Sequence, residues 1–383
     1  MTKNSKTNRQ TAKRQGEQNL WEYVALWKMT QNLQHRLTFG IDLGDRASCW
    51  CALDGEGEVV ARGAVVTEKQ PLKVLFSRIP ASLIAIEVGT HSSWVSRTLT
   101  ELGHEVIVAN ARQVKVISQS NKKNDKRDAE FLARLVRVDR KLLAPIQHRG
   151  EMAQADLMAV RMRAQFVELR TQAINAVRGS VKAFGERLPK CDAATLNRKY
   201  AAELPPAIRP YVEQMLEVIE VLTEQIAKSD EVLKQISKER YAHETAQLQQ
   251  VKGVGPVTAL TFVLTLDDAT RFKKSRDVGA FLGLRPKSNQ SGSSEPEMRI
   301  SKEGDSYLRT MLVQCSQYIL GQRGPDTDLK RWGLELAGKG KKNAKKRAVV
   351  AVARKLAVLL HALWVSGERY EPRRHNREIA QAA

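Results

Sequence analysis

The sequence predicts a mixed α/β domain at the N-terminus, a pair of long helices in the middle and a mainly α-helical C-terminal domain. Three observations predict this order: short apolar runs up to residue 109, heptad spacing of apolar residues between 150 and 245, and glycine-rich turns between helical runs after 250. The chain has 383 residues, which is enough for two or three domains.

The first part alternates strand-like runs with tight turns. Asp54-Gly-Glu-Gly57 is typical of a hairpin turn, and helix-like stretches flank the fourth apolar run. Three strands joined by turns, followed by two joined through helices, predict a mixed sheet with helices on its faces. We expect strands over residues 37–44, 47–53, 59–66, 83–88 and 105–109.

The middle region changes to helical periodicity. Its second half alternates four and three residues, interrupted only by Ser229, which favours coiled-coil packing. An antiparallel hairpin and a dimer-forming coiled coil both fit, and the alternative is an ordinary helical bundle. The two expected stripes are Ala155, Met158, Met162, Phe166, Leu169, Ala173, Val177, Val181 and Phe184, then Val212, Met215, Ile219, Leu222, Ile226, Ser229, Leu233 and Ile236.

Composition points to a globular protein with a polyanionic partner. Lys and Arg number 63 against 42 Asp and Glu, so the formal charge is 63 − 42 = +21, and nucleic acid is the leading partner. Four cysteines exclude a disulfide scaffold and fit reduced thiols in a cytoplasm. We expect no membrane span and no secretory signal, because no apolar run approaches about 20 residues and no apolar segment follows the basic N-terminus.

Four carboxylates follow predicted strand ends or open a helix: Asp42, Glu87, Asp125 and Asp128. Gathered together they would repel one another, and a hard divalent cation such as Mg²⁺ or Mn²⁺ would remove that cost. Taken singly, each motif also fits a plain turn or a helix start.

The last domain carries two further motifs. Val251-Lys-Gly-Val-Gly-Pro256 is typical of a helix-hairpin-helix turn, whose backbone N–H groups approach a phosphate. A Ser/Gly loop over residues 288–294 lies between Phe281-Leu-Gly-Leu-Arg-Pro286 and the basic run 299–309. From composition alone this loop is a flexible linker.

The order Asp42, Glu87, Asp125, Asp128 resembles the D-E-D-D set of RuvC-like domains with the RNase H fold. More specifically, the chain resembles transposases of the insertion-sequence one-ten family. Their second domain carries G-L-x-P, then S-G, then I-[ST]-K-x-G-[ND]-x-x-L-R, and each step is present here in order. The resemblance implies that Ser291 is the nucleophile, with Ser293 and Ser294 as alternatives.

The resemblance also implies what the protein does: site-specific DNA recombination through a covalent serine–DNA link, with donor and target DNA chosen by a structured guide RNA. Family members build the active site from two subunits, so a homodimer or homotetramer is expected, acting in a bacterial cytoplasm at the nucleoid. The implied division is a basic arm, a RuvC-like domain, a coiled-coil hairpin, a serine-containing transposase domain and a tail, over residues 1–36, 37–148, 149–246, 247–368 and 369–383.

Basic residues near these motifs are candidates for phosphate contacts, although each also fits a solvated surface. A rival interpretation is a metal-dependent, structure-specific endonuclease resembling a Holliday-junction resolvase, which needs no serine. A sugar-kinase-like ATPase and an inactive nucleic-acid-binding protein fit less well. The nucleic-acid candidates are Lys122, Lys123, Lys126, Arg127, Lys252, Gly253, Gly255, Arg299, Lys302, Arg309, Lys341, Lys342, Lys345, Lys346 and Arg347.

Overall fold

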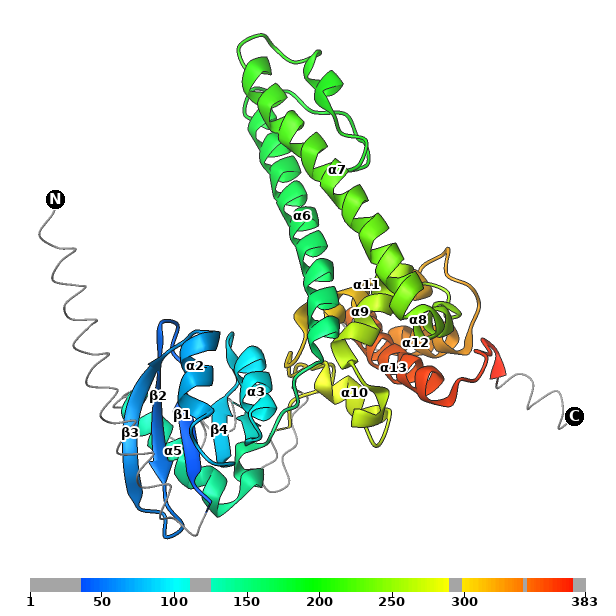
Figure 1. Ribbon diagram of the computed structural model, residues 1–383. Coiled ribbons are helices and arrows are strands. Elements are labelled where there is room, and N and C mark those ends of the chain that lie inside the picture. The colour runs from blue at the N-terminus through cyan, green and yellow to red at the C-terminus, as the bar shows by residue number, and fades with distance from the viewer. Residues whose placement is uncertain (1–35, 111–124, 289–297, 340–342, 375–383) are drawn as a thin grey trace, which may run out of the picture. The chain divides into compact units, whose positions relative to one another are not determined.

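The computed structural model describes residues 36–110, 125–288, 298–339 and 343–374 (Figure 1). The chain divides into two compact units, residues 1–149 and 150–383. The first holds a sheet with helices and the second is helical, which confirms the mixed α/β plus helical organisation expected from the sequence.

A five-stranded mixed sheet forms the centre of the first unit, in the order β3-β2-β1-β4-β5. β1, β2 and β3 pair antiparallel, whereas β1, β4 and β5 run parallel. The parallel strands need crossovers, which α2 (Lys69–Phe76) and α3 (Ser92–Glu101) help to supply. The strands span Thr38–Asp42, Ala47–Leu53, Val59–Val66, Leu83–Glu87 and Glu105–Ala109.

The two faces of the sheet bury different residues of the same strands. Phe39 and Ile41 of β1 pack in one cluster with residues of α2 and α3. Ala85 of β4 packs in another cluster with Leu132 of α5 (Asp125–Val138). Because side chains alternate along a strand, the even-numbered residues of β1 and the odd-numbered residues of β4 face α5.

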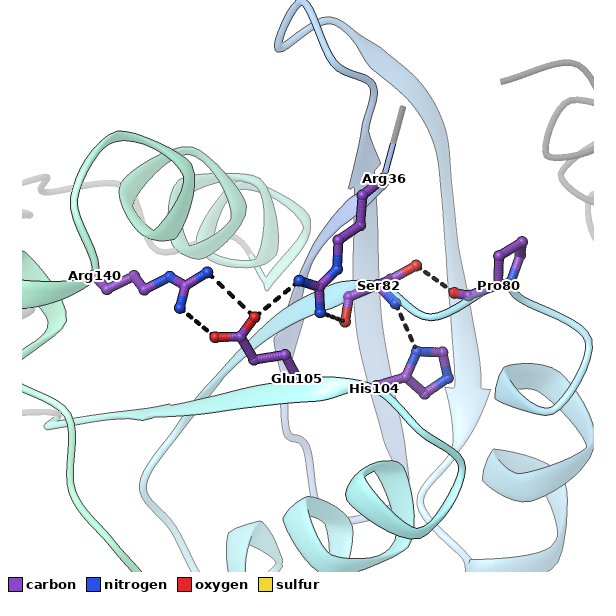
Figure 2. Close-up of polar contacts among 6 residues, drawn as sticks. All are labelled: Arg36, Pro80, Ser82, His104, Glu105 and Arg140. Carbon is purple, nitrogen blue, oxygen red and sulfur yellow. Dashed lines mark hydrogen bonds and ion pairs between the residues drawn. The ribbon is translucent and has the colours of Figure 1, made fainter. Parts of the chain in front are cut away.

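Polar contacts hold the start of the parallel strands together (Figure 2). Glu105, the first residue of β5, accepts hydrogen bonds from Arg36 at 2.9 Å and from Arg140 of the 3₁₀ helix η1 (Arg140–Leu143). Beside them, His104 accepts from the Ser82 N–H at 3.2 Å through Nδ1, so its Nε2–H donates to the Phe76 carbonyl at 3.1 Å. Burial lowers the pKa of His104, which is 3% exposed.

Two 32-residue helices begin the second unit: α6 (Glu151–Lys182) and α7 (Arg209–Arg240). They pack against each other as a hairpin, and polar contacts join them along its length. These contacts are Arg240 to Asp156, Arg163 to Asp230 and Arg170 to Thr223. As the residue number on α6 rises from 156 to 170, the number of its partner on α7 falls from 240 to 223. The helices are therefore antiparallel, which is one of the two arrangements that the heptad pattern allows.

The heptad stripe predicts the buried face of α7 better than that of α6. Most of the α7 stripe is buried, although Leu216 is buried where Met215 was expected. On α6 the side chains of Met158, Met162 and Leu169 are 61%, 53% and 42% exposed, and Leu157 and Val160 are buried instead. The first part of the expected α6 stripe is therefore an apolar face that lies exposed among the described residues. In its second part the prediction is correct, because Val177 and Val181 are buried in a cluster with Val212 and Leu216 of α7.

The remaining helices surround one apolar cluster. α13 (Ala344–Ser366) is apolar and long enough by length and composition to cross a membrane. One face of it lies in this cluster, through residues such as Val352 and Leu356, and the other carries Lys346, Arg354 and Lys355. The helices are α8 (Ala242–Gln249), α9 (Pro256–Leu266), α10 (Arg276–Phe281), α11 (Ser306–Leu320), α12 (Asp328–Gly338) and α13 (Ala344–Ser366).

Candidate functional site

Asp42 and Glu87 end two adjacent parallel strands. The pairing of Ile41 with Ile86 is the last one before them, so the two acids occupy equivalent positions on β1 and β4. Both side chains lie on the sheet face that α5 covers, because each is an even number of residues from Gly40 or Ala85. Two of the four predicted acids are thus side by side.

The direction of α5 brings a third acid to the same end of the sheet. Near its C-terminus, Arg134 and Arg137 donate to the carbonyls of Gly57 and Gly55 at 3.2 and 2.6 Å. That turn adjoins the first residue of β1, since Thr38 pairs with Leu53. The first turn of α5, which carries the half-buried Asp128, therefore lies toward the end of β1 where Asp42 stands.

Close packing fixes this arrangement at Gly40. A Cβ at this position would lie 2.0 Å from the Ala129 carbonyl oxygen and 2.5 Å from the Ala133 nitrogen. Both atoms belong to the backbone of α5, so only a glycine lets the helix approach the strand this closely. The fourth acid, Asp125, is the first residue of α5, and the description of the structure does not extend to its side chain.

The donor set suits a hard divalent cation, because every predicted ligand is a carboxylate oxygen. Within the described residues, no three or more His, Cys, Asp or Glu side chains are close enough together to hold a metal ion as they stand. The chemistry and the location therefore fit a cation, and the ligation itself stays a prediction.

Residues beside the acids were missed by the sequence analysis. His91 lies 3.6 Å from Asp45 through Nε2, and its Nδ1 accepts from Trp94 Nε1 at 3.2 Å. Ser92 closes the turn after β4 by donating to the Gly89 carbonyl at 2.7 Å. The motif A-I-E-V-G-T stops just before these residues, and they become neighbours of the site only because β1 and β4 end together.

The predicted nucleophile Ser291 lies outside the described residues, as do Ser293 and Ser294, but the two segments on either side are paired. Pro286 and Ile300 form an antiparallel bridge. The Lys287 N–H donates to the Arg299 carbonyl at 3.0 Å, and the Ser301 N–H donates to the Arg285 carbonyl at 2.9 Å. The segments before and after the serine loop are thus held together by backbone pairing between residues 285–287 and 299–301.

The glycines of the motif allow a close approach between its two halves. Gly283 has φ +65°, and a Cβ on it would lie 2.3 Å from Glu303 backbone atoms. Gly304 has φ +68°, and its Cβ would lie 2.0 Å from the Phe281 carbonyl oxygen. Arg309 spans the junction, because its Nη1 donates to the Leu282 and Glu303 carbonyls at 3.0 and 2.8 Å.

A further contact, missed by sequence reasoning, anchors this motif to the hairpin. Asp305 caps α11 by accepting from the Leu308 N–H at 2.7 Å, and it forms an ion pair with Arg161 of α6. The Arg161 guanidinium also lies 5.2 Å from the centroid of the Tyr307 ring. Nothing in the local sequence marks Arg161, because its partners are 144 or more residues away.

The predicted phosphate-binding residues fall in separate places. Lys126 and Arg127 are exposed on the first turn of α5. Lys252, Gly253 and Gly255 lie in the turn between α8 and α9, and the helix-hairpin-helix motif expected there stays a prediction. Lys345 is exposed on α13, Lys122, Lys123, Lys341 and Lys342 lie outside the described residues, and one cavity of the second unit brings together Arg299, Lys302, Lys346 and Arg347.

Comparison with known proteins matches both halves of the chain. Residues 39–185 match a family model described as "Transposase", of the DEDD type, and residues 245–329 match the model "Transposase IS116/IS110/IS902 family". The first match covers the strands that carry Asp42 and Glu87, and the second covers the turn between α8 and α9 and the serine motif.

Curated relatives agree along most of their length. The transposase for insertion sequence element IS1111A of Coxiella burnetii is 28% identical over 90% of this chain and 93% of its own. The transposase for insertion sequence element IS1328 of Yersinia enterocolitica is 29% identical over 73% and 83%. The protein y4pF/y4sB of Sinorhizobium fredii is 31% identical over 77% and 76%. The chain therefore belongs to the IS116/IS110/IS902 family of DEDD transposases.

Proposed function

We propose that this transposase cuts and rejoins DNA through a covalent bond between Ser291 and a DNA strand, with Asp42, Glu87, Asp125 and Asp128 as the cation-binding set. The observation that carries the proposal is the side-by-side position of Asp42 and Glu87 on the face where α5 begins. The family membership supplies DNA as the substrate.

The serine step conserves the number of phosphodiester bonds. The Ser291 oxygen attacks phosphorus, the Oγ–P bond forms, and the bond from phosphorus to the leaving deoxyribose oxygen breaks. The serine proton passes to a base or to water, and the leaving oxygen takes up a proton. In the rejoining step a strand-end hydroxyl attacks the same phosphorus and releases the serine, so no nucleotide cofactor is consumed.

The carboxylates would hold Mg²⁺ or Mn²⁺, and a bound cation would stabilise negative charge on the phosphoryl oxygens. Asp42 and Glu87 are the better-supported ligands, because the sheet fixes both at one edge. Asp128 depends on the packing of α5 against Gly40. Asp125 is proposed from the D-E-D-D order alone.

Guidance by a structured RNA fits the charge of the chain. An excess of 21 positive charges suits a protein that holds RNA and DNA together. Base pairing would then select the sequence, while Lys252 and the α8–α9 turn would contact backbone phosphates. We expect RNA to copurify with the protein from cells that carry the whole element, and its digestion to abolish site-specific cutting.

Assembly into a dimer or tetramer is supported by the uncovered apolar face of α6. Met158, Met162 and Leu169 recur on one side of this helix and are largely exposed. An exposed apolar stripe of this kind is typical of an interface. In this proposal the helical hairpin, residues 149–246, is the assembly element, between a RuvC-like domain and a serine-containing domain.

The competing function is a metal-dependent, structure-specific endonuclease that releases its product by hydrolysis. The experiment that decides uses purified protein with copurified RNA, Mg²⁺, and donor plus target DNA, on a denaturing gel. We expect a protein–DNA adduct in wild type that disappears in both Ser291→Ala and Asp42→Ala. Nicking without an adduct, kept in Ser291→Ala and lost in Asp42→Ala, would contradict the serine mechanism and establish the hydrolase.

A further inference from the structure

The second unit contains a cavity of about 1000 Å³ with an unusual lining. Its walls come from α10, α12, α13 and the two paired segments beside the serine motif. Among the residues that the structure describes, every lining residue is apolar or basic and none is acidic. The apolar ones are Leu284, Pro286, Met298, Ile300, Trp332, Val350, Ala351 and Val358, and the basic ones are Arg276, Arg299, Lys302, Lys346, Arg347, Arg354 and Lys355.

One helix supplies much of this lining. Two rows of residues four apart along α13 line the cavity, Lys346–Val350–Arg354–Val358 and Arg347–Ala351–Lys355. In each row basic and apolar side chains alternate. The same wall can therefore contact a flat apolar group and an anion at the same time.

We propose that this cavity binds one unstacked nucleotide of the DNA substrate, with the base inside and its phosphates on the basic residues. This inference rests on the proposed function only in taking DNA as the ligand. A base is flat and apolar on its faces and is joined to anionic phosphates, which matches the apolar and basic side chains of the described lining. A duplex keeps its bases stacked inside, so only an unstacked nucleotide presents both groups together.

Trp332 gives the cavity an aromatic wall. Its ring is half-buried and packs against the apolar cluster, and Lys355 Nζ lies 4.3 Å from the ring centroid. In this proposal the base stacks on the part of the Trp332 ring that lines the cavity, and stacking on aromatic rings tolerates every base. The site is thus expected to recognise that a base is present rather than which base it is.

The location next to the serine motif gives the site a role. Pro286 and Ile300, which pair with each other, both line the cavity, and Arg299 and Lys302 follow in the same segment. A nucleotide held here would have its backbone fixed beside the segments that flank Ser291. Extrusion of one base would also select DNA that has been locally opened over intact duplex.

The test compares the affinity of the full-length protein for three fluorescent oligonucleotides of equal length: a single strand, an abasic strand with the same phosphates, and a duplex. Wild type should bind the base-bearing single strand about tenfold more tightly than the abasic strand. Ala351→Trp, which fills the cavity without a change in charge, should reduce that ratio to about one. Ala362→Trp, on an exposed part of the same helix, is the matched control and should keep the ratio.

A second measurement needs no variant. A photoreactive 5-iodouracil base in the single strand should crosslink wild type at Trp332 or Met298, which peptide mass spectrometry would identify. Equal affinity for the base-bearing and abasic strands, a ratio unchanged by Ala351→Trp, or crosslinks confined to residues outside the cavity would each overturn the proposal. The last result is also expected if another part of the chain fills the cavity.

The two proposals fail separately. An adduct on Ser291 without any preference for a base keeps the recombinase mechanism and removes the nucleotide site. A preference and crosslinks in the cavity without an adduct keep the nucleotide site and remove the serine mechanism.

Discussion

Asp42 and Glu87 are the last residues of the neighbouring parallel strands β1 and β4, one position beyond the paired Ile41 and Ile86. Because of this relationship, cation binding by the two acids can be tested by substituting one of them. We expect Glu87→Gln to lose at least about 100-fold in DNA cleavage, because a cation would lose a charged ligand. Saturating Mg²⁺ should raise the Tm of wild type but not of the variant.

The control for this experiment is Glu101→Gln, which changes an exposed carboxylate on α3 by the same atoms. It should leave both cleavage and the metal-dependent Tm shift intact. An equal Tm shift in wild type and Glu87→Gln would argue that this acid binds no cation.

Gly40→Ala should displace α5, which carries Asp128, from the sheet. The new Cβ would meet the backbone of α5 at Ala129 and Ala133, so the helix and Asp128 must move away from the sheet. We expect a loss of about 1–3 kcal/mol in the free energy of unfolding, as for an overpacked core, together with loss of cleavage. Chemical denaturation and the adduct assay measure the two effects.

Gly179→Ala is the matched control, because nothing lies within 4 Å of its added Cβ and the residue is inside α6. It should stabilise the protein by about 0.5–1 kcal/mol, since alanine is the better helix former. Comparable losses in both variants would mean that the space around Gly40 does not matter.

The apolar face of α6 predicts the effect of charge on assembly. Met158→Glu combined with Met162→Glu should shift a dimer or tetramer toward the monomer, because two carboxylates would be buried in the interface. Light scattering coupled to gel filtration gives the mass. Lys234→Glu on α7 changes the net charge by the same two units at an exposed position and should leave the mass unchanged.

Tyr241 predicts an alkaline limit to stability. Its hydroxyl donates to the buried carboxylate of Asp156 at 2.9 Å, and burial followed by this hydrogen bond raises its pKa from 10.0 to about 12. The folded protein thus holds this proton more tightly than the unfolded chain. The resulting stability is complete below pH 10 and is lost as the pH rises through 12.

Tyr241→Phe should therefore cost about 1–2 kcal/mol at neutral pH and flatten the alkaline part of the stability curve. Urea unfolding at a series of pH values measures both. A variant whose curve parallels wild type above pH 10 would show that this tyrosine is not responsible.

His104 predicts the opposite dependence. Its pKa is below the usual 6.5, mainly through burial, so the unfolded chain takes up a proton more readily than the folded protein. Stability is consequently lost as the pH falls below 6.5. His104→Phe should remove that component and cost about 2–4 kcal/mol at neutral pH, because the Ser82 N–H and the Phe76 carbonyl lose their partner.

The strands of the first unit could be predicted from local sequence patterns. Strands 47–53, 59–66 and 105–109 have the bounds expected from their apolar runs and the turn residues beside them. The order of the strands follows from short connections and crossover rules. The position of Asp42 and Glu87 at one edge was expected for the same reason.

The packing of α6 could not be read in this way. An apolar stripe indicates that a helix packs against a partner. Where a helix has two apolar faces, the stripe does not indicate which face contacts that partner. Val160 and Leu157 are buried against α7 and α9, whereas Met158 and Met162 are exposed, although all four are apolar and lie within two turns. Likewise, Arg161 and Asp305 are 144 residues apart in the sequence, so no local pattern predicts that they pair.

The hairpin leaves the helical core and returns to the same place. Leu157 of α6 and Leu233 of α7 share one cluster with α9, and the far end around Val177 and Leu196 has a cluster of its own. Adding seven residues to each helix would move that far end by about 10 Å and leave the inner cluster in register. The length of the hairpin can therefore change without any change in the packing of α6 and α7 against α9.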